Sequence, residues 1–162
     1  MVAVLMGVSG SGKTTLGKEL AALLDWTFVE GDDFHPAANV EKMAAGTPLD
    51  DDDRRPWLRA LGGLVAEACG RGEHVVLACS ALKQDHRDRL ERDATGCVRF
   101  VYLTASEELI RGRLEARDGH FMGPTLLGSQ FDALEPPADA VRVDVAPAPG
   151  EVAADIRRRL AL

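Results

Sequence analysis

A glycine-rich stretch near the start of the chain has the residue types and the spacing of a phosphate-binding loop. It runs Gly7-Val8-Ser9-Gly10-Ser11-Gly12-Lys13-Thr14 and fits the pattern G-x-x-x-x-G-K-[ST]. Glycine allows backbone N–H groups to converge on phosphate oxygens and permits left-handed dihedral angles. An apolar run, Val2–Met6, precedes the loop, and a helical pattern follows it. This context is the one that the motif requires, so the loop predicts nucleotide binding.

The side chains of this loop have distinct expected tasks. Lys13 would place its charge on the β- and γ-phosphates of ATP, and Thr14 would offer a hydroxyl ligand to Mg²⁺, while the positive end of the following helix adds to the field. A glycine-rich turn without a ligand is the alternative, although the full pattern arises by chance in only about one chain of this length in a hundred. No acidic residue ends the third apolar run, so no Walker B aspartate is apparent and Thr14 is the one metal ligand predicted. The expected nucleotide-binding residues are Gly7, Ser9, Gly10, Ser11, Gly12, Lys13, Thr14 and Thr15.

A second polar group follows the next apolar run and contains the candidate catalytic carboxylate. It reads Gly31-Asp32-Asp33-Phe34-His35-Pro36. A strand that ends here would direct Asp32 toward the same sheet edge as the phosphate-binding loop. A carboxylate in that place can orient an attacking hydroxyl and accept its proton. We therefore predict that Asp32 is catalytic; an acidic turn and helix N-cap is the alternative, which suits Asp33 better.

Three basic residues are candidates for binding an anionic acceptor. Arg54 follows the acidic run Asp50–Asp53 at the start of an expected helix, and its guanidinium could hold a carboxylate through two hydrogen bonds. A structural ion pair is the alternative for Arg54. Lys83 and Arg87 follow the third apolar run four residues apart, so they share one helix face near the strand ends. They suit an anionic acceptor, and an exposed, solvated pair is the alternative.

The segment after the fourth apolar run has the features of a lid. Arg113 and Arg117 lie one turn apart on an expected helix, and glycines flank the residues that follow. Both arginines could close over the triphosphate, neutralise charge on the transferred group and exclude water. We expect the lid to span roughly residues 113–131; an arginine-rich solvated helix is the alternative. For adenine, we expect contacts from the loop Val145–Pro149.

These residues need a scaffold that brings them to one edge, and the pattern of the chain predicts one. Strands that are apolar throughout and alternate with helices indicate an α/β fold with a parallel sheet covered on both faces, with ligands at the carboxyl ends of the strands. The 162 residues suffice for one domain, which we place at residues 1–162. The expected strands are Val2–Met6, Thr27–Val29, Val75–Cys79, Val98–Leu103 and Val141–Val145. The expected helices are Lys13–Leu24, Asn39–Ala45, Arg54–Cys69, Lys83–Arg92, Ser106–Arg117 and Val152–Leu160.

Composition argues against several classes of function. The formal net charge of −7 and the isoelectric point near 5.1 disfavour a nucleic-acid binder, which normally presents a basic face. The first apolar run meets glycines and has no basic leader, so it predicts neither a signal peptide nor a membrane span. The cysteines, Cys69, Cys79 and Cys97, lack the spacing of a zinc site or a redox pair. We expect them to be buried free thiols in a reducing cytoplasm.

With these motifs assembled, the chain resembles the gluconate kinase (gluconokinase) family of small-molecule P-loop kinases along nearly its whole length. The middle part that carries the resemblance comprises Gly31-Asp32, His35-Pro36, Asn39, Lys42-Met43, Gly46, Pro48-Leu49, Asp51, Asp53-Arg54 and Pro56-Trp57-Leu58. The later part comprises Cys79-Ser80-Ala81-Leu82-Lys83, Arg87-Asp88, Arg113-Leu114, Arg117, Gly119-His120-Phe121-Met122, Leu126-Leu127, Ser129-Gln130-Phe131 and Leu134-Glu135. Ala78, His86 and Gly128 depart from the family's usual residues, and none carries a predicted chemical role.

The resemblance implies both a fold and a reaction. The fold is a P-loop NTPase three-layer sandwich with a five-stranded parallel sheet and a helical lid. The reaction is phosphorylation of the 6-hydroxyl of D-gluconate by ATP with Mg²⁺, commonly by a homodimer, and the resemblance extends the expected substrate contacts to His35, His120 and Gln130. A related kinase that acts on another small hydroxylated acid or a nucleotide, and a non-catalytic nucleotide-binding module, are the two alternatives.

Overall fold

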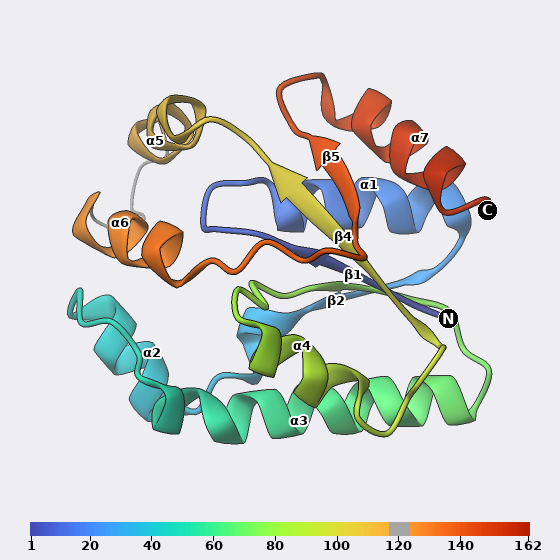
Figure 1. The fold of residues 1–162 in the computed structure, drawn as a ribbon, viewed down its shortest axis with the longest axis horizontal. Helices are drawn as coiled ribbons and strands as arrows, with labels where there is room; N and C mark the ends of the chain where they lie inside the picture. Colours follow the sequence, from blue (N-terminus) through green and yellow to red (C-terminus); the bar gives the residue numbers. More distant parts are fainter. Residues whose placement is uncertain (117–123) are drawn as a thin grey trace.

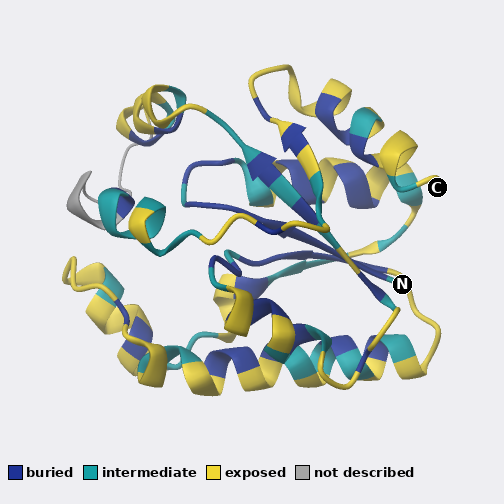
Figure 2. Ribbon diagram, viewed as in Figure 1, coloured by how far each residue is buried: buried dark blue, intermediate teal, exposed yellow. Residues whose placement is uncertain are grey.

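Five parallel strands form one sheet in the computed structural model, which describes residues 1–116 and 124–162 (Figure 1). The strand order is β2-β3-β1-β4-β5, and Val2 of the central strand pairs with Val75 on one side and Val98 on the other. All five residues of β1 are buried, because helices cover both faces of the sheet there (Figure 2). The strands are β1 (Val2–Met6), β2 (Thr27–Glu30), β3 (Val75–Ala78), β4 (Val98–Thr104) and β5 (Val141–Asp144). The predicted parallel sheet is confirmed.

Helices form a layer on each face of this sheet. One layer contains α1 and α7, whose Leu20 and Ile156 are fully buried in a cluster with Leu5 of β1. The other contains α3 and α4, and here Leu61 packs in a cluster with Val4. Side chains of one strand alternate between the two clusters, so the three-layer architecture follows from the pleat. The helical segments are α1 (Lys13–Leu24), the 3-10 helix η1 (Gly31–Phe34), α2 (Ala37–Ala44), α3 (Asp51–Gly70), α4 (Gln84–Glu91), α5 (Glu107–Glu115), α6 (Pro124–Ala133) and α7 (Pro149–Arg159).

The start of α3 differs from the prediction, which began that helix at Arg54. The Asp50 side chain accepts a hydrogen bond from the Asp53 backbone N–H at 2.8 Å, and the Asp53 side chain accepts one from the Asp50 backbone N–H at 3.0 Å. This capping box satisfies two N–H groups that have no partner inside the helix. The acidic run is therefore the cap and first turn of the helix. Its negative charges are stabilised there by the positive end of the helix dipole.

Two helical segments were absent from the predicted helices, although most of α6 falls within the predicted lid, residues 113–131. The 3-10 helix η1 follows β2 directly, and α6 ends at Ala133. Leu127 of α6 is 1% exposed and packs in a cluster with Val8 and Leu82, so burial of this side chain anchors the helix. The predicted lid arginine Arg117 and the predicted substrate contact His120 lie outside the described residues.

The expectation for the cysteines was wrong for two of the three. Cys69 at the end of α3 and Cys97 just before β4 form a disulfide, with their Cα atoms 6.1 Å apart. Residues 28 positions apart meet here because α3 runs back along the sheet to the edge from which β4 starts. Cys79 is a buried free thiol, as expected. Throughout the described parts of the chain, the helices are too short or too polar to cross a membrane.

Candidate active site

The phosphate-binding loop joins β1 to α1 and has the backbone that its glycines permit. Gly10 and Gly12 adopt φ angles of 81° and 91°, in the left-handed region that disfavours residues with a Cβ atom. Lys13 Nζ donates hydrogen bonds to the carbonyl oxygens of Gly7 and Val8, both at 3.0 Å. The ammonium group therefore lies over the loop, close to where the bound phosphates of a nucleotide would be.

Thr14 lies beside a carboxylate that was not among the predicted site residues. Its Oγ1 donates a hydrogen bond to Glu30 Oε2 at 2.6 Å, and Glu30 is the last residue of β2. Mg²⁺ in kinases is bound by one or two protein oxygens together with waters and substrate phosphates, so a hydroxyl and a carboxylate in contact fit this ion. The described residues contain no larger cluster of acidic, His or Cys side chains that could hold a metal. An acidic residue at the carboxyl end of a strand was the signal that could have identified Glu30.

A cavity on one side of the loop collects most of the predicted acceptor-binding residues, and we call it the Asp32 cavity. It has a volume of about 90 Å³ and extends from the phosphate-binding loop to the first turns of α3. Loop, η1, α3 and α6 all contribute to it, although they are far apart in sequence. Its lining residues are Ser9, Lys13, Asp32, His35, Met43, Thr47, Pro48, Leu49, Arg54, Trp57, Ser80, Ser129 and Gln130.

The position of Asp32 depends on a buried tryptophan. Trp57 Nε1 donates a hydrogen bond to the Gly31 carbonyl oxygen at 2.7 Å, and the Trp57 ring stacks on His35 with a centroid distance of 4.3 Å. Asn39 Nδ2 lies 3.3 Å from His35 Nδ1 and donates to the Asp53 carbonyl oxygen at 2.8 Å. Burial lowers the pKa of His35, so the ring is neutral at physiological pH. These contacts fix the η1 backbone, while the Asp32 side chain stays 68% exposed and faces the cavity.

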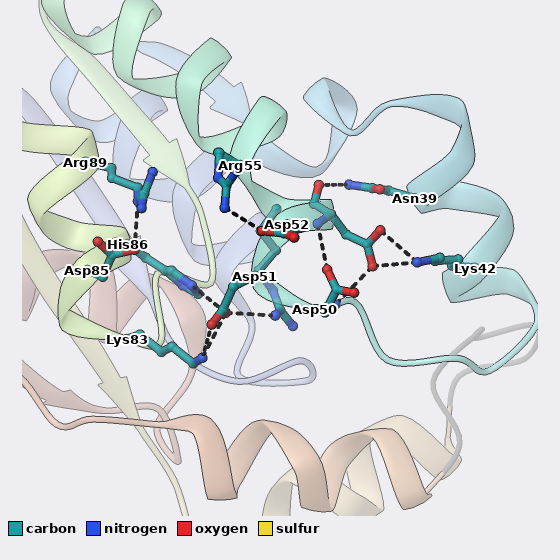
Figure 3. Close-up of polar contacts among 12 residues, drawn as sticks. Asn39, Lys42, Asp50, Asp51, Asp52, Arg55, Lys83, Asp85, His86 and Arg89 are labelled. Carbon is teal, nitrogen blue, oxygen red and sulfur yellow. Dashed lines mark hydrogen bonds and ion pairs between the residues drawn. The ribbon is translucent and has the colours of Figure 1, made fainter.

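Asp51 connects the predicted acceptor-binding cations. Lys83 Nζ contacts both Asp51 carboxylate oxygens, at 2.8 and 2.9 Å (Figure 3). Arg54 Nη1 lies 3.7 Å from Asp51 Oδ1. The hydrogen bond from Lys83 lowers the pKa of Asp51. His86 Nε2 lies 4.0 Å from the same oxygen, and burial, together with the positive charges of Arg54 and Lys83, lowers the pKa of His86 to about 4. Of these cations, Arg54 lines the Asp32 cavity, and Lys83 is not among its lining residues.

Arg87 does not lie at the Asp32 cavity, although it was predicted to bind the anionic acceptor. It is 3% exposed, and its guanidinium donates hydrogen bonds to the carbonyl oxygens of Ala81 and Leu82 and to Gln84 Oε1. Its side chain is therefore occupied with the loop between β3 and α4 and does not line the Asp32 cavity. The prediction placed Lys83 and Arg87 on one helix face, but α4 begins at Gln84, Lys83 is its extended N-cap residue, and the two side chains have different partners.

A second cavity, of about 280 Å³, lies on the other side of the loop, and we call it the Arg113 cavity. Arg113 Nη2 donates a hydrogen bond to the Val145 carbonyl oxygen at 2.6 Å. The expected adenine loop and Arg113 thus line the same space, away from the Asp32 cavity. Gly7 donates its backbone N–H to the Ser80 carbonyl oxygen, and Ser11 is fully buried, so these two residues support the loop from within. The lining residues are Gly10, Gly12, Thr15, Leu16, Arg113, Ala116, Val145, Pro147 and Pro149.

Comparison with known proteins places the chain in a family. A family model described as an AAA domain matches residues 2–134. A probable gluconokinase of Xenopus tropicalis is 42% identical over 100% of this chain and 96% of its own length, and the thermosensitive gluconokinase of Escherichia coli K12 is 47% identical over 88% of this chain and 78% of its own. The solved structure of a gluconokinase from Sinorhizobium meliloti 1021 superposes with a TM-score of 0.86 at 42% identity, covering 99% of this chain and 95% of that one. The phosphate-binding loop, the two flanking cavities and this similarity over the full length together show that the chain belongs to the gluconokinase family.

Proposed function

We propose that this protein transfers the γ-phosphate of ATP to the 6-hydroxyl of D-gluconate and releases ADP and 6-phospho-D-gluconate. One observation supports this most directly: a single cavity joins Lys13 of the phosphate-binding loop, the carboxylate of Asp32 and the guanidinium of Arg54. A cation that binds the transferred phosphate, a proton acceptor and a carboxylate-binding group are what phosphorylation of a hydroxylated acid requires of the protein. The identity of the acceptor as gluconate is taken from the gluconokinase relatives.

The reaction needs positioning more than covalent help from the protein. ATP would bridge the loop, with its base and ribose in the Arg113 cavity and its terminal phosphate at the Asp32 cavity. The gluconate hydroxyl oxygen attacks the γ-phosphorus, the bond to the β–γ bridging oxygen breaks, and Asp32 accepts the hydroxyl proton. Lys13 neutralises charge on the transferred group, and Arg54 holds the gluconate carboxylate at the far end.

Mg²⁺, when bound, would neutralise the triphosphate and orient it. Thr14 and Glu30 are the residues that we propose hold it, either directly or through waters. Their hydrogen bond keeps both oxygens at the carboxyl end of β2, on the side of the loop where the phosphates must lie.

The proposal also includes roles for several further residues. Lys83 would support gluconate binding through Asp51 and Arg54, whereas Arg87 would act by holding the loop after β3. His35 and Gln130 line the Asp32 cavity and would contact the acceptor. From the family resemblance we propose a single kinase domain over residues 1–162 with a lid near 113–131 that includes Arg117 and His120, a homodimeric assembly and a cytoplasmic location.

The test is ADP release from Mg·ATP with D-gluconate, shikimate, AMP, glycerate or no acceptor. Strong stimulation by gluconate alone would establish the acceptor. Stimulation by another compound would retain the kinase and overturn the assignment of Arg54 as a gluconate-binding residue. ADP release that is independent of any acceptor would favour a nucleotide-binding module instead.

A further inference from the structure

The phosphate-binding loop is bridged to α6 by a hydrogen bond that spans most of the chain. The backbone N–H of Ser9 donates to Gln130 Oε1 at 2.6 Å, across 121 residues of sequence. Backbone N–H groups of such a loop are the donors that bind nucleotide phosphates. In this structure, a side-chain carbonyl thus occupies one of the donors that the motif reserves for phosphate.

The lining of the two cavities, taken with the proposed function, indicates which phosphate would come closest to this donor. Gly10, Gly12 and Thr15 open into the Arg113 cavity, whereas Ser9 and Lys13 open into the Asp32 cavity. If the base lies in the Arg113 cavity, the phosphate chain crosses the loop and its last phosphate reaches Ser9. ADP is one phosphate shorter and ends before that point. This step rests on the proposed function.

Packing makes the contact a built feature of the fold. Leu127 lies one turn before Gln130 on α6 and is buried in a cluster with Val8, the residue before Ser9. Phe131, the next residue after Gln130, packs against the same cluster. The apolar contacts on both sides hold Gln130 opposite the Ser9 N–H, while the side chain also lines the Asp32 cavity.

We propose that Gln130 is a positioning residue that distinguishes ATP from ADP. Its carbonyl occupies the Ser9 N–H when the site is empty or holds ADP, and the γ-phosphate of ATP takes that N–H and displaces it. The displaced amide turns within the Asp32 cavity, where its oxygen and its two N–H groups meet the acceptor hydroxyls. ATP binding in this way prepares the acceptor site.

The experiment measures binding of two nucleotides with Mg²⁺ and without acceptor, by calorimetry. The probes are ADP and an ATP analogue with a nitrogen bridge between the β- and γ-phosphates. Gln130→Ala removes the competing carbonyl, so the affinity ratio of analogue to ADP should rise about 2- to 10-fold, the change made by one net hydrogen bond. Gln130→Glu keeps an acceptor for Ser9 and adds a negative charge, so the ratio should fall by about tenfold or more.

Gln84→Glu is the matched control, because this exposed glutamine on α4 lines neither cavity, undergoes the same charge change and should leave the ratio unchanged. If Gln130→Ala fails to fold, Gln130→Asn shortens the side chain and should shift the ratio in the same direction. An unchanged ratio, or equal shifts for both nucleotides, overturns the proposal. Because no acceptor is present in this experiment, a failure of gluconate to stimulate ADP release would not affect the proposal for Gln130. If neither nucleotide bound, both that proposal and the proposed kinase function would be overturned.

Discussion

Replacing Gly31 with alanine should damage catalysis more than folding. Gly31 lies between β2 and Asp32, and a Cβ atom added there would be 2.4 Å from the Ala78 carbonyl oxygen of β3. Ordinary van der Waals contact begins at 3.4 Å, so the backbone at this position must move away from β3 by about 1 Å. Because Ala78 lies in the sheet and is fully buried, the movement falls on η1 and Asp32.

The expected magnitudes follow from this displacement. Overpacking of one methyl group in a buried contact costs about 1–3 kcal/mol of stability, which a protein of this size can tolerate. A misplacement of about 1 Å in a catalytic group can reduce the rate about 100-fold. The same movement would disturb the hydrogen bond from Trp57 to the Gly31 carbonyl oxygen, which also holds this backbone in place.

The assay compares kcat with saturating ATP and gluconate, nucleotide affinity and the melting temperature of the variant. We expect kcat to fall about 100-fold while nucleotide affinity stays unchanged, because the phosphate-binding loop is not displaced. Gly63→Ala is the control, since no heavy atom lies within 4 Å of the added Cβ and the residue is inside α3. A folded Gly31→Ala variant with kcat close to the wild-type value would refute the view that this contact positions Asp32.

Four further substitutions test the site and the buried histidine beside it. Asp32→Asn should retain ATP binding and lower kcat by about 10²- to 10⁴-fold, measured by steady-state kinetics and calorimetry, because proton acceptance is lost; near-normal turnover would remove Asp32 from the mechanism. Arg54→Lys should raise the gluconate KM about tenfold and leave the ATP KM unchanged. Lys83→Met should raise the gluconate KM by a smaller factor. A larger effect from Lys83→Met than from Arg54→Lys would contradict the placement of Arg54 on the cavity wall. His86 is neutral when folded, with a pKa of about 4 against 6.5 unfolded, so stability should fall by about 3 kcal/mol as the pH drops from 6.5 to 4. His86→Phe should flatten that part of the denaturation profile, and an unaltered profile would show that another group dominates it.

The local parts of the molecule were predictable from the sequence. The phosphate-binding loop, the five strands and α1 depend on short-range properties: glycine dihedral freedom, apolar runs of β-branched residues, and helical periodicity. Asp32 could be located because it follows a strand end, and strand ends of a parallel sheet share one edge.

Other site features depended on contacts between distant segments. Lys83 and Arg87 look alike in sequence, yet one contacts Asp51 at the surface and the other is buried against backbone carbonyl groups. Only the packing of α4 on α3 decides which of the two is buried. Glu30 likewise belongs to the candidate site only because the fold places Thr14 of α1 within hydrogen-bond distance of its carboxylate.

The sequence by itself determined that this chain carries a phosphate-binding motif, that its sheet is parallel and that Asp32 follows a strand end, since each of these is encoded within a few consecutive residues. The tertiary structure decided which cations reach the Asp32 cavity, that Cys69 meets Cys97, and that Gln130 lies on the Ser9 N–H. Those pairings join residues far apart in the chain, and their geometry is set by how buried apolar faces fit together, which no local pattern records.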